Sequence, residues 1–157
     1  MTQNEYDVTV IKVVDGDTVD VDINLGFGVE LKDERVRVMG IDTEESRTSD
    51  KVEDLFGETA KARVKELMKD GAKLITTEDK GGEDMKGKFG RILGDFRLPS
   101  GKTLTETLIE EHLAVPYHGQ SKDDIRSQHL YNREILLERG VVSIEDYDAA
   151  MKLMEDK

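Results

Sequence analysis

A chain of 157 residues is long enough for one domain with a single hydrophobic core. It has no Cys, which excludes disulfides and thiolate chemistry. Any metal site must therefore use oxygen or His ligands, so a hard cation such as Ca²⁺ or Mg²⁺ fits better than Zn²⁺. Its 23 basic and 35 acidic residues give a net charge of −12, which argues against generic binding of nucleic acid, although a bound divalent cation would supply local positive charge.

The N-terminal residues 1–7 carry neither a basic region nor an apolar run. We therefore see no secretory signal and no transmembrane span, and we expect no membrane partner. The sequence predicts a cytoplasmic protein, in a cellular or phage-encoded role, unless a leader has been removed.

The first half of the chain has the alternation expected of β-strands. Apolar and polar residues alternate over 6–14, and the alternation is complete over 19–25, which predicts a half-buried strand with one solvated face. A third strand is expected over 29–41, after a turn at 26–28. The stretch 43–57 is polar and has no period, so it predicts a long loop, which in a compact domain is usually functional or mobile.

Helical spacing of apolar residues dominates the second half, where a Ser-x-x-Asp cap and a final Gly bound one segment. Three strands, a helix, two strands and then helices indicate an α+β fold. Five short strands with a helix between the third and the fourth match a small closed Greek-key β-barrel of the OB type. The remaining predicted elements are a helix over 58–69, a strand over 72–78, a hairpin loop over 79–87, a strand over 88–98, helices over 103–114 and 121–139, and an amphipathic helix after Ser143.

Two interpretations of Asp15-Gly16-Asp17-Thr18 are open. Asp and Gly are common turn residues, so a tight turn explains the tetrapeptide taken alone. A second acidic cluster at 42–45 favours a metal site, because Asp17 and Asp42 could each give one oxygen to a hard cation, with a backbone carbonyl and water completing the shell.

Glu45 lies just beyond this second cluster and could orient or deprotonate a water molecule that attacks a bound phosphate. The alternative for the cluster is a solvated acidic loop, which is normal in a chain that is 37% charged. We favour that alternative for Glu44 and Glu53.

Two arginines have the chemistry for a phosphate. Arg37 lies on a predicted strand and Arg91 follows a Gly, and guanidinium groups bind phosphate oxygens in pairs without titrating. Such a pair could neutralise the charge of a pentacoordinate transition state. The alternative is a cross-strand salt bridge, which we favour for Arg35.

The other candidates are weaker. The three His residues have no metal-ligand spacing, so we interpret His112, His118 and His129 as ordinary residues. Tyr117 could offer an aromatic face to a base, although packing in the core explains it nearly as well.

Several separated motifs occur in a characteristic order and spacing between Tyr6 and Gly140. They are Val13 to Val19, Arg35 to Glu45, Val52-Glu53, Gly57 to Ala60, Lys88 to Arg91, and Leu113 to Tyr117. Together they resemble the staphylococcal (micrococcal) nuclease family, the SNase-like or thermonuclease domain, and such a distributed pattern seldom arises by chance.

The resemblance implies an OB-fold barrel with three helices and a Ca²⁺-dependent phosphodiesterase. Its reaction would be endonucleolytic cleavage of DNA and RNA, preferably single-stranded or locally open, to 3′-phosphate and 5′-hydroxyl ends. The implied site residues are Asp17, Asp42 and the carbonyl of Thr43 as Ca²⁺ ligands, Glu45 as general base, Arg37 and Arg91 at the scissile phosphate, and Lys88 and Tyr117 at the nucleotide.

The chain departs from the family pattern in three respects, the first of which is its acidic net charge, where the best-known member has a basic surface. Glu44 stands where the family usually has Pro, which adds negative charge beside the expected metal. The C-terminal residues extend past the matching region, so we expect a monomeric nuclease domain over 1–142 and an amphipathic, short helical extension over 143–157 that either covers the barrel or mediates self-association.

Two other classes of function are weighed against the nuclease. A non-catalytic OB-fold module that only binds nucleic acid would usually have lost an acid or an arginine, and none is lost here. An acidic protein-interaction module built on the C-terminal helix would not need this polar set.

Overall fold

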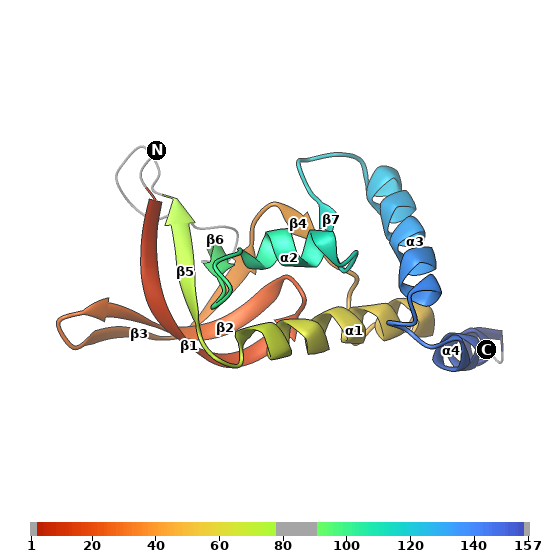
Figure 1. Cartoon of the computed structure of the whole chain (residues 1–157), viewed down its shortest axis with the longest axis horizontal. Helices are drawn as coiled ribbons and strands as arrows, with labels where there is room; N and C mark the ends of the chain where they lie inside the picture. Colours follow the sequence, from red (N-terminus) through yellow and green to blue (C-terminus); the bar gives the residue numbers. More distant parts are fainter. Residues whose placement is uncertain (1–2, 78–90, 156–157) are drawn as a thin grey trace.

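A computed structural model describes residues 3–77 and 91–155 (Figure 1). In these residues five strands close a barrel in the order β1-β2-β3-β6-β5, accompanied by four helices. This confirms the predicted α+β class, the barrel and the additional C-terminal helix. The barrel strands are β1 (Gln3–Asp15), β2 (Thr18–Gly26), β3 (Val29–Val38), β5 (Ala72–Thr77) and β6 (Ile92–Arg97), the helices are α1 (Lys51–Met68), α2 (Leu104–Glu110), α3 (Lys122–Glu138) and α4 (Ile144–Glu155), and two short strands, β4 (Ile41–Asp42) and β7 (Val115–Pro116), form a separate antiparallel pair.

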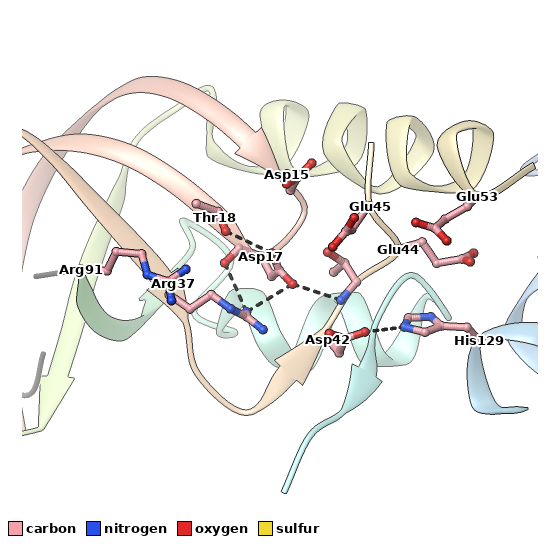
Figure 2. A pocket seen from close by; sticks show the side chains of 11 residues that line it. Asp15, Asp17, Thr18, Arg37, Asp42, Glu44, Glu45, Glu53, Arg91 and His129 are labelled. Carbon is pink, nitrogen blue, oxygen red and sulfur yellow. Dashed lines mark hydrogen bonds and ion pairs between the residues drawn. The ribbon is translucent and has the colours of Figure 1, made fainter. Parts of the chain in front are cut away.

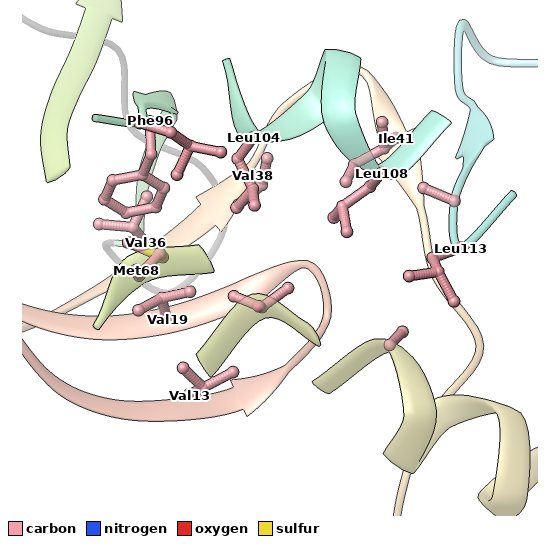
Figure 3. Close-up of a cluster of buried hydrophobic side chains, with 14 of the residues drawn as sticks. Val13, Val19, Val36, Val38, Ile41, Met68, Phe96, Leu104, Leu108 and Leu113 are labelled. Atoms are coloured by element: carbon pink, nitrogen blue, oxygen red, sulfur yellow. The ribbon is translucent and has the colours of Figure 1, made fainter. Parts of the chain in front are cut away.

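The alternating pattern of β2 is confirmed by its burial. Val19, Val21 and Ile23 point into the barrel and are almost completely buried. There they pack in one core cluster with residues of β3, β6, α1 and α2, part of which Figure 3 shows. Because fully burying one such side chain contributes roughly 1.5–3 kcal/mol, this apolar face fixes which side of each strand faces inward.

The third predicted strand, 29–41, is interrupted. Gly40 adopts a left-handed conformation (φ 84°), so the chain turns after β3 and the next two residues form β4, which pairs with β7. The end of β3 pairs in parallel with β6, and Arg37 lies opposite Leu93. This pairing closes the barrel and brings the start of β6 beside the end of β3.

The predicted loop over 43–57 was wrong in its second half, because α1 begins at Lys51 and not at 58. The Asp50 side chain caps the helix by accepting hydrogen bonds from the backbone N–H groups of Val52 and Glu53, both at 3.0 Å. A stripe with a period of four then faces the core: Val52, Phe56, Ala60, Val64 and Met68. The charged residues between them concealed this stripe in the sequence.

The helices of the second half lie where the sequence predicts them, but α2 is shorter than 103–114. It ends at Glu110 because His112 takes a left-handed conformation (φ 62°), which is incompatible with the helix. Ser121 caps α3 by accepting a hydrogen bond from the Asp124 N–H, as predicted. The predicted hairpin loop over 79–87 lies outside the described residues.

The C-terminal helix α4 packs on the end of α1 that lies away from the barrel (Figure 1). Tyr147 meets the ring of Phe56 edge-on, with ring centroids 6.3 Å apart, and Ala150 is buried. The extension therefore covers α1 and not the barrel itself. None of the helices in residues 3–77 and 91–155 is both long and apolar enough to span a membrane.

Candidate active site

A pocket of about 550 Å³ lies at one end of the barrel and gathers charged side chains from distant parts of the chain (Figure 2). Among the described residues it brings together six carboxylates and two guanidinium groups. Figure 2 shows the arginines on one side of Asp17 and the glutamates on the other. The lining residues are Asp15, Asp17, Thr18, Arg37, Asp42, Thr43, Glu44, Glu45, Glu53, Arg91 and His129.

Asp17 occupies the turn between β1 and β2, at the centre of this pocket. Antiparallel pairing places the next residue, Thr18, opposite Arg37 of β3, so the carboxylate meets the guanidinium at 3.2 Å. Asp17 also accepts a hydrogen bond from the Thr43 N–H at 3.2 Å. Burial nevertheless raises the pKa of Asp17, although Arg37 and this hydrogen bond oppose the shift. Burial thus outweighs the stabilisation that Arg37 and the Thr43 N–H give to the ionised carboxylate.

Arg37 is held by the backbone around it. Its guanidinium donates hydrogen bonds to the carbonyl oxygens of Val38 and Ile41, at 2.8 and 3.2 Å. These bonds fix the side chain across the turn between β3 and β4, with part of it still exposed to the pocket. Arg91, just before β6, lines the same pocket because β3 and β6 pair in parallel.

The loop that carries Glu45 is anchored on both sides of that residue. Before Glu45, the Thr43 N–H donates a hydrogen bond to Asp17. After Glu45, the Ser46 N–H donates to Asp15 Oδ1 at 3.3 Å, and the Ser46 hydroxyl donates a second, shorter hydrogen bond to the same oxygen. Glu45 itself is exposed and lines the pocket. Asp15 and Asp17 thus hold the loop backbone on both sides of Glu45, which fixes the position of that residue.

Gly57 allows the same loop to lie directly on α1. A Cβ atom at this position would fall 2.2 Å from the Glu45 carbonyl oxygen, which no side chain could tolerate. The residue is therefore Gly for close approach, in the middle of a helix where Gly is otherwise destabilising. It was missed as a site residue because a Gly in a polar stretch looks like a loop residue in the sequence.

Asp42 is the last residue of β4, and a side chain of α3 holds its carboxylate. Its Oδ2 lies 2.7 Å from Nε2 of the buried His129. The interpretation of His129 as an ordinary residue was therefore incomplete, since it orients a candidate metal ligand. No pattern in the sequence indicates this contact, because the two residues are separated by 87 positions.

The interpretation of Glu44 as a solvated residue was wrong. Its carboxylate forms a bidentate ion pair with Arg133 of α3, with Nε at 2.9 and 3.0 Å from the two oxygens, and the two side chains are only 10% and 11% exposed. The Arg133 guanidinium also lies over the Phe56 ring, 5.3 Å from its centroid. The extra negative charge at position 44 is thus neutralised within the protein and ties the loop to α3.

Replacing Arg133 by Ala should lower the free energy of unfolding by about 3 kcal/mol, because it leaves the Glu44 carboxylate buried without its partner. Urea denaturation measures this change, and adding Glu44→Gln should recover part of the loss. Arg126→Ala, an exposed position of the same helix, is the matched control. A loss of less than about 0.5 kcal/mol would mean that the pair contributes no more than a surface ion pair.

Glu53 behaves differently from Glu44. It lines the pocket at the start of α1, and burial, with the nearby carboxylates of Glu45, Glu44 and Asp50, raises its pKa. No oppositely charged group within 4.0 Å pairs with it among the described residues. Its interpretation as a solvated acid is therefore only partly correct.

The remaining predicted residues have mixed outcomes. Arg35 forms the predicted cross-strand salt bridge, with Nε 2.8 Å from Asp20 Oδ1. Tyr117 is 46% exposed, which argues against a packing role, and its N–H donates to the Gly40 carbonyl beside the pocket. Lys88 lies outside the described residues.

The donor set fits a hard cation. Asp17, Asp42 and the Thr43 backbone offer only oxygen atoms, and the buried Thr43 hydroxyl oxygen lacks a hydrogen-bond partner within residues 3–77 and 91–155. No group of three or more His, Cys, Asp or Glu side chains converges for a metal in that part of the chain. A cation here would therefore depend on two carboxylates completed by backbone and water oxygens.

Two proteins named as endonucleases are similar to this chain. The chain is 32% identical over 155 residues to the SPbeta prophage-derived endonuclease YokF of Bacillus subtilis (strain 168), an alignment that covers 93% of this chain and 49% of that protein. It is 37% identical over 107 residues to endonuclease YncB of the same strain, covering 68% of this chain and 46% of that protein. The chain thus spans about half the length of the curated relatives it matches.

The family profile described as staphylococcal nuclease homologue matches residues 35–136, which run from the strand bearing Arg37 to the helix bearing His129 and Arg133. That range includes β4, β5, β6 and the pocket residues from Arg37 to His129, whereas β1, β2 and Asp17 precede it. On this evidence the chain belongs to the staphylococcal nuclease homologue family.

Proposed function

We propose that this chain is a Ca²⁺-dependent endonuclease that hydrolyses phosphodiester bonds of DNA and RNA. The observation that carries the proposal is the convergence of Asp17, Asp42, Glu45, Arg37 and Arg91 on one pocket. The printed names of YokF and YncB, both endonucleases, support it. The products would be 3′-phosphate and 5′-hydroxyl ends.

In the proposed reaction Arg37 and Arg91 hold the scissile phosphate from one side of the pocket. A water molecule on the glutamate side attacks phosphorus, Glu45 takes its proton, and the bond from phosphorus to the 5′ oxygen breaks. The leaving oxygen takes up a proton from solvent water and becomes the 5′-hydroxyl. The two guanidinium groups match the negative charge that grows on the phosphoryl oxygens in the transition state.

Asp17, Asp42 and the Thr43 carbonyl would hold the Ca²⁺ ion. When bound, the ion supplies Lewis-acid stabilisation of the phosphate and offsets the excess of carboxylates in the pocket. His129 would keep Asp42 in its orientation, and Tyr117, with Lys88, would contact the nucleotide.

The assay that tests the proposal is cleavage of single- and double-stranded DNA, and of RNA, in Ca²⁺, Mg²⁺ or EDTA. We expect Ca²⁺-dependent cutting, faster on single-stranded or locally open substrates. A folded protein that binds nucleic acid without cutting it in any of these cations would instead be a non-catalytic binding module.

Ca²⁺ should raise the melting temperature of the wild-type protein and not that of Asp17→Asn. At a Ca²⁺ concentration of 100 Kd, binding stabilises the folded state by about 2.7 kcal/mol. Because folding raises the pKa of Asp17, its ionised form opposes folding above that pKa. Asp17→Asn should therefore melt at or above the wild-type temperature in EDTA at neutral pH.

Thermal unfolding of both proteins in EDTA and in Ca²⁺ measures these shifts. Asp22→Asn, on the strand β2 that follows Asp17 and outside the pocket, is the matched control and should keep the Ca²⁺ response. An equal response of Asp17→Asn and wild type would remove Asp17 from the metal site.

We also propose that residues 1–142 act as the nuclease domain, in a monomer, with 143–157 as its C-terminal extension. The family match ends at residue 136, and the packing of α4 on α1 supports an accessory, stabilising role for the extension.

A further inference from the structure

A second groove adjoins the candidate active site, between α3 and the strands β4 and β7. It has a volume of about 440 Å³ and shares Arg37, Asp42, Glu44 and His129 with the active-site pocket. A strand held at the two arginines can therefore continue into this groove without leaving the surface. The sequence resemblance assigns only Tyr117 among the groove's other residues.

The two cavities have opposite charge. Six carboxylates and two guanidinium groups line the active-site pocket, whereas four cationic side chains and two carboxylates line the α3 groove in the described part of the chain. Both of those carboxylates are engaged, Glu44 by Arg133 and Asp42 by His129. The groove is therefore locally positive in a protein whose net charge is −12.

Lys122 and Arg126 are the cations at the outer end of this groove. They lie one turn apart on α3, so they project from the same face of the helix. Both are exposed, and neither has an ion-pair partner within residues 3–77 and 91–155. In contrast, Arg35, Arg63 and Arg97 are each paired with a carboxylate.

Apolar surface accompanies these charges. Leu130 is 42% exposed and Ile125 half-buried on the same helix, and the exposed Tyr117 lines the same groove. Gln120 shapes the end of the groove, because its amide donates to the Pro116 carbonyl at 2.6 Å and accepts from the His118 N–H at 2.8 Å. Cations alternating with apolar and aromatic surface are the features that hold single-stranded nucleic acid.

We infer that the α3 groove binds the nucleotides that flank the scissile phosphate, with Lys122 and Arg126 on backbone phosphates and Leu130 and Tyr117 against a base. The inference rests on the proposed function for the position of the scissile bond. It makes α3 a substrate-binding element, and it explains how an acidic protein can retain a polyanion: positive charge that is unpaired within the described residues lines the track of the strand.

The test measures binding of a labelled oligothymidylate of about a dozen nucleotides. Fluorescence anisotropy monitors the binding at several salt concentrations. Lys122→Ala/Arg126→Ala should weaken binding about three- to tenfold. The slope of the logarithm of the binding constant against the logarithm of the salt concentration should become shallower by about two, because roughly two fewer counterions are released. In cleavage assays the same variant should raise KM for the oligonucleotide and leave kcat, and the rate on a dinucleotide, unchanged.

Lys61→Ala/Lys65→Ala is the matched control, because it removes the same charge from α1, where both residues line a separate groove. It should bind as wild type. Wild-type binding by the α3 variant, or an equal loss in the control, would overturn the inference. If the wild-type protein never cuts but its binding still depends on Lys122 and Arg126, the groove stands as a binding site and the proposed catalytic function fails.

Discussion

Glu45→Gln should lower kcat by about 10²- to 10⁴-fold, because the amide cannot accept the proton of the attacking water. Gln has nearly the shape of Glu, and the loop is anchored through Thr43 and Ser46, not through the Glu45 side chain. Binding of Ca²⁺ and of nucleotide should therefore change little. Single-turnover cleavage in saturating Ca²⁺ separates this loss of chemistry from any loss of binding.

The control for Glu45→Gln is Glu58→Gln, the same chemical change at an exposed position of α1 outside the pocket. It should cut at the wild-type rate. Weakened binding with an unchanged rate in Glu45→Gln would refute the role as general base and point to a ligand or structural role instead.

Arg91→Ala should lower kcat on the order of 10³-fold, since it removes one of only two guanidinium groups in the described part of the pocket. Charge grows on the phosphoryl oxygens during attack, so the loss should be larger in kcat than in substrate affinity. Steady-state cleavage kinetics, with circular dichroism to check the fold, measure it.

Arg37→Ala should lose a similar factor in rate and also destabilise the fold by about 1–3 kcal/mol, because the carbonyls of Val38 and Ile41 lose their donor. Arg37→Lys should restore part of the stability but little of the rate, since an ammonium group cannot bind two oxygens in one plane.

Arg35→Ala serves as the control for both arginines. It lies on the same face of β3 as Arg37 but is paired with Asp20. Near-wild-type rates in Arg91→Ala would exclude that residue from the chemistry.

The strands of the barrel could be predicted because their signal is local. Val19, Val21 and Ile23 alternate with polar residues, and this period of two requires one buried face whatever the partner strand. The candidate metal and phosphate residues could be named for a similar reason, since carboxylates and guanidinium groups carry their chemistry in the residue type and the family motifs carry their order.

The start of α1 could not be predicted in this way. The buried stripe from Val52 to Met68 has a period of four, and its first turns are interleaved with acids and with Gly57. Gly57 is explained only by the loop that lies on it, with the Glu45 carbonyl where a Cβ would be. A sequence shows the Gly but not the backbone that excludes a side chain there.

By itself, the sequence determined the barrel, the additional C-terminal helix and the identity of the residues that could act on a phosphodiester. Only the tertiary structure decided which of those residues are held, and by what. Glu44 pairs with Arg133, which is 89 positions away in the sequence, and Asp42 contacts His129, which is 87 positions away. Both contacts form because β4 and the loop after it lie against α3. Such contacts depend on how elements pack and leave no periodic trace in the chain, so an acid that looks solvated in sequence is a buried ion pair in the fold.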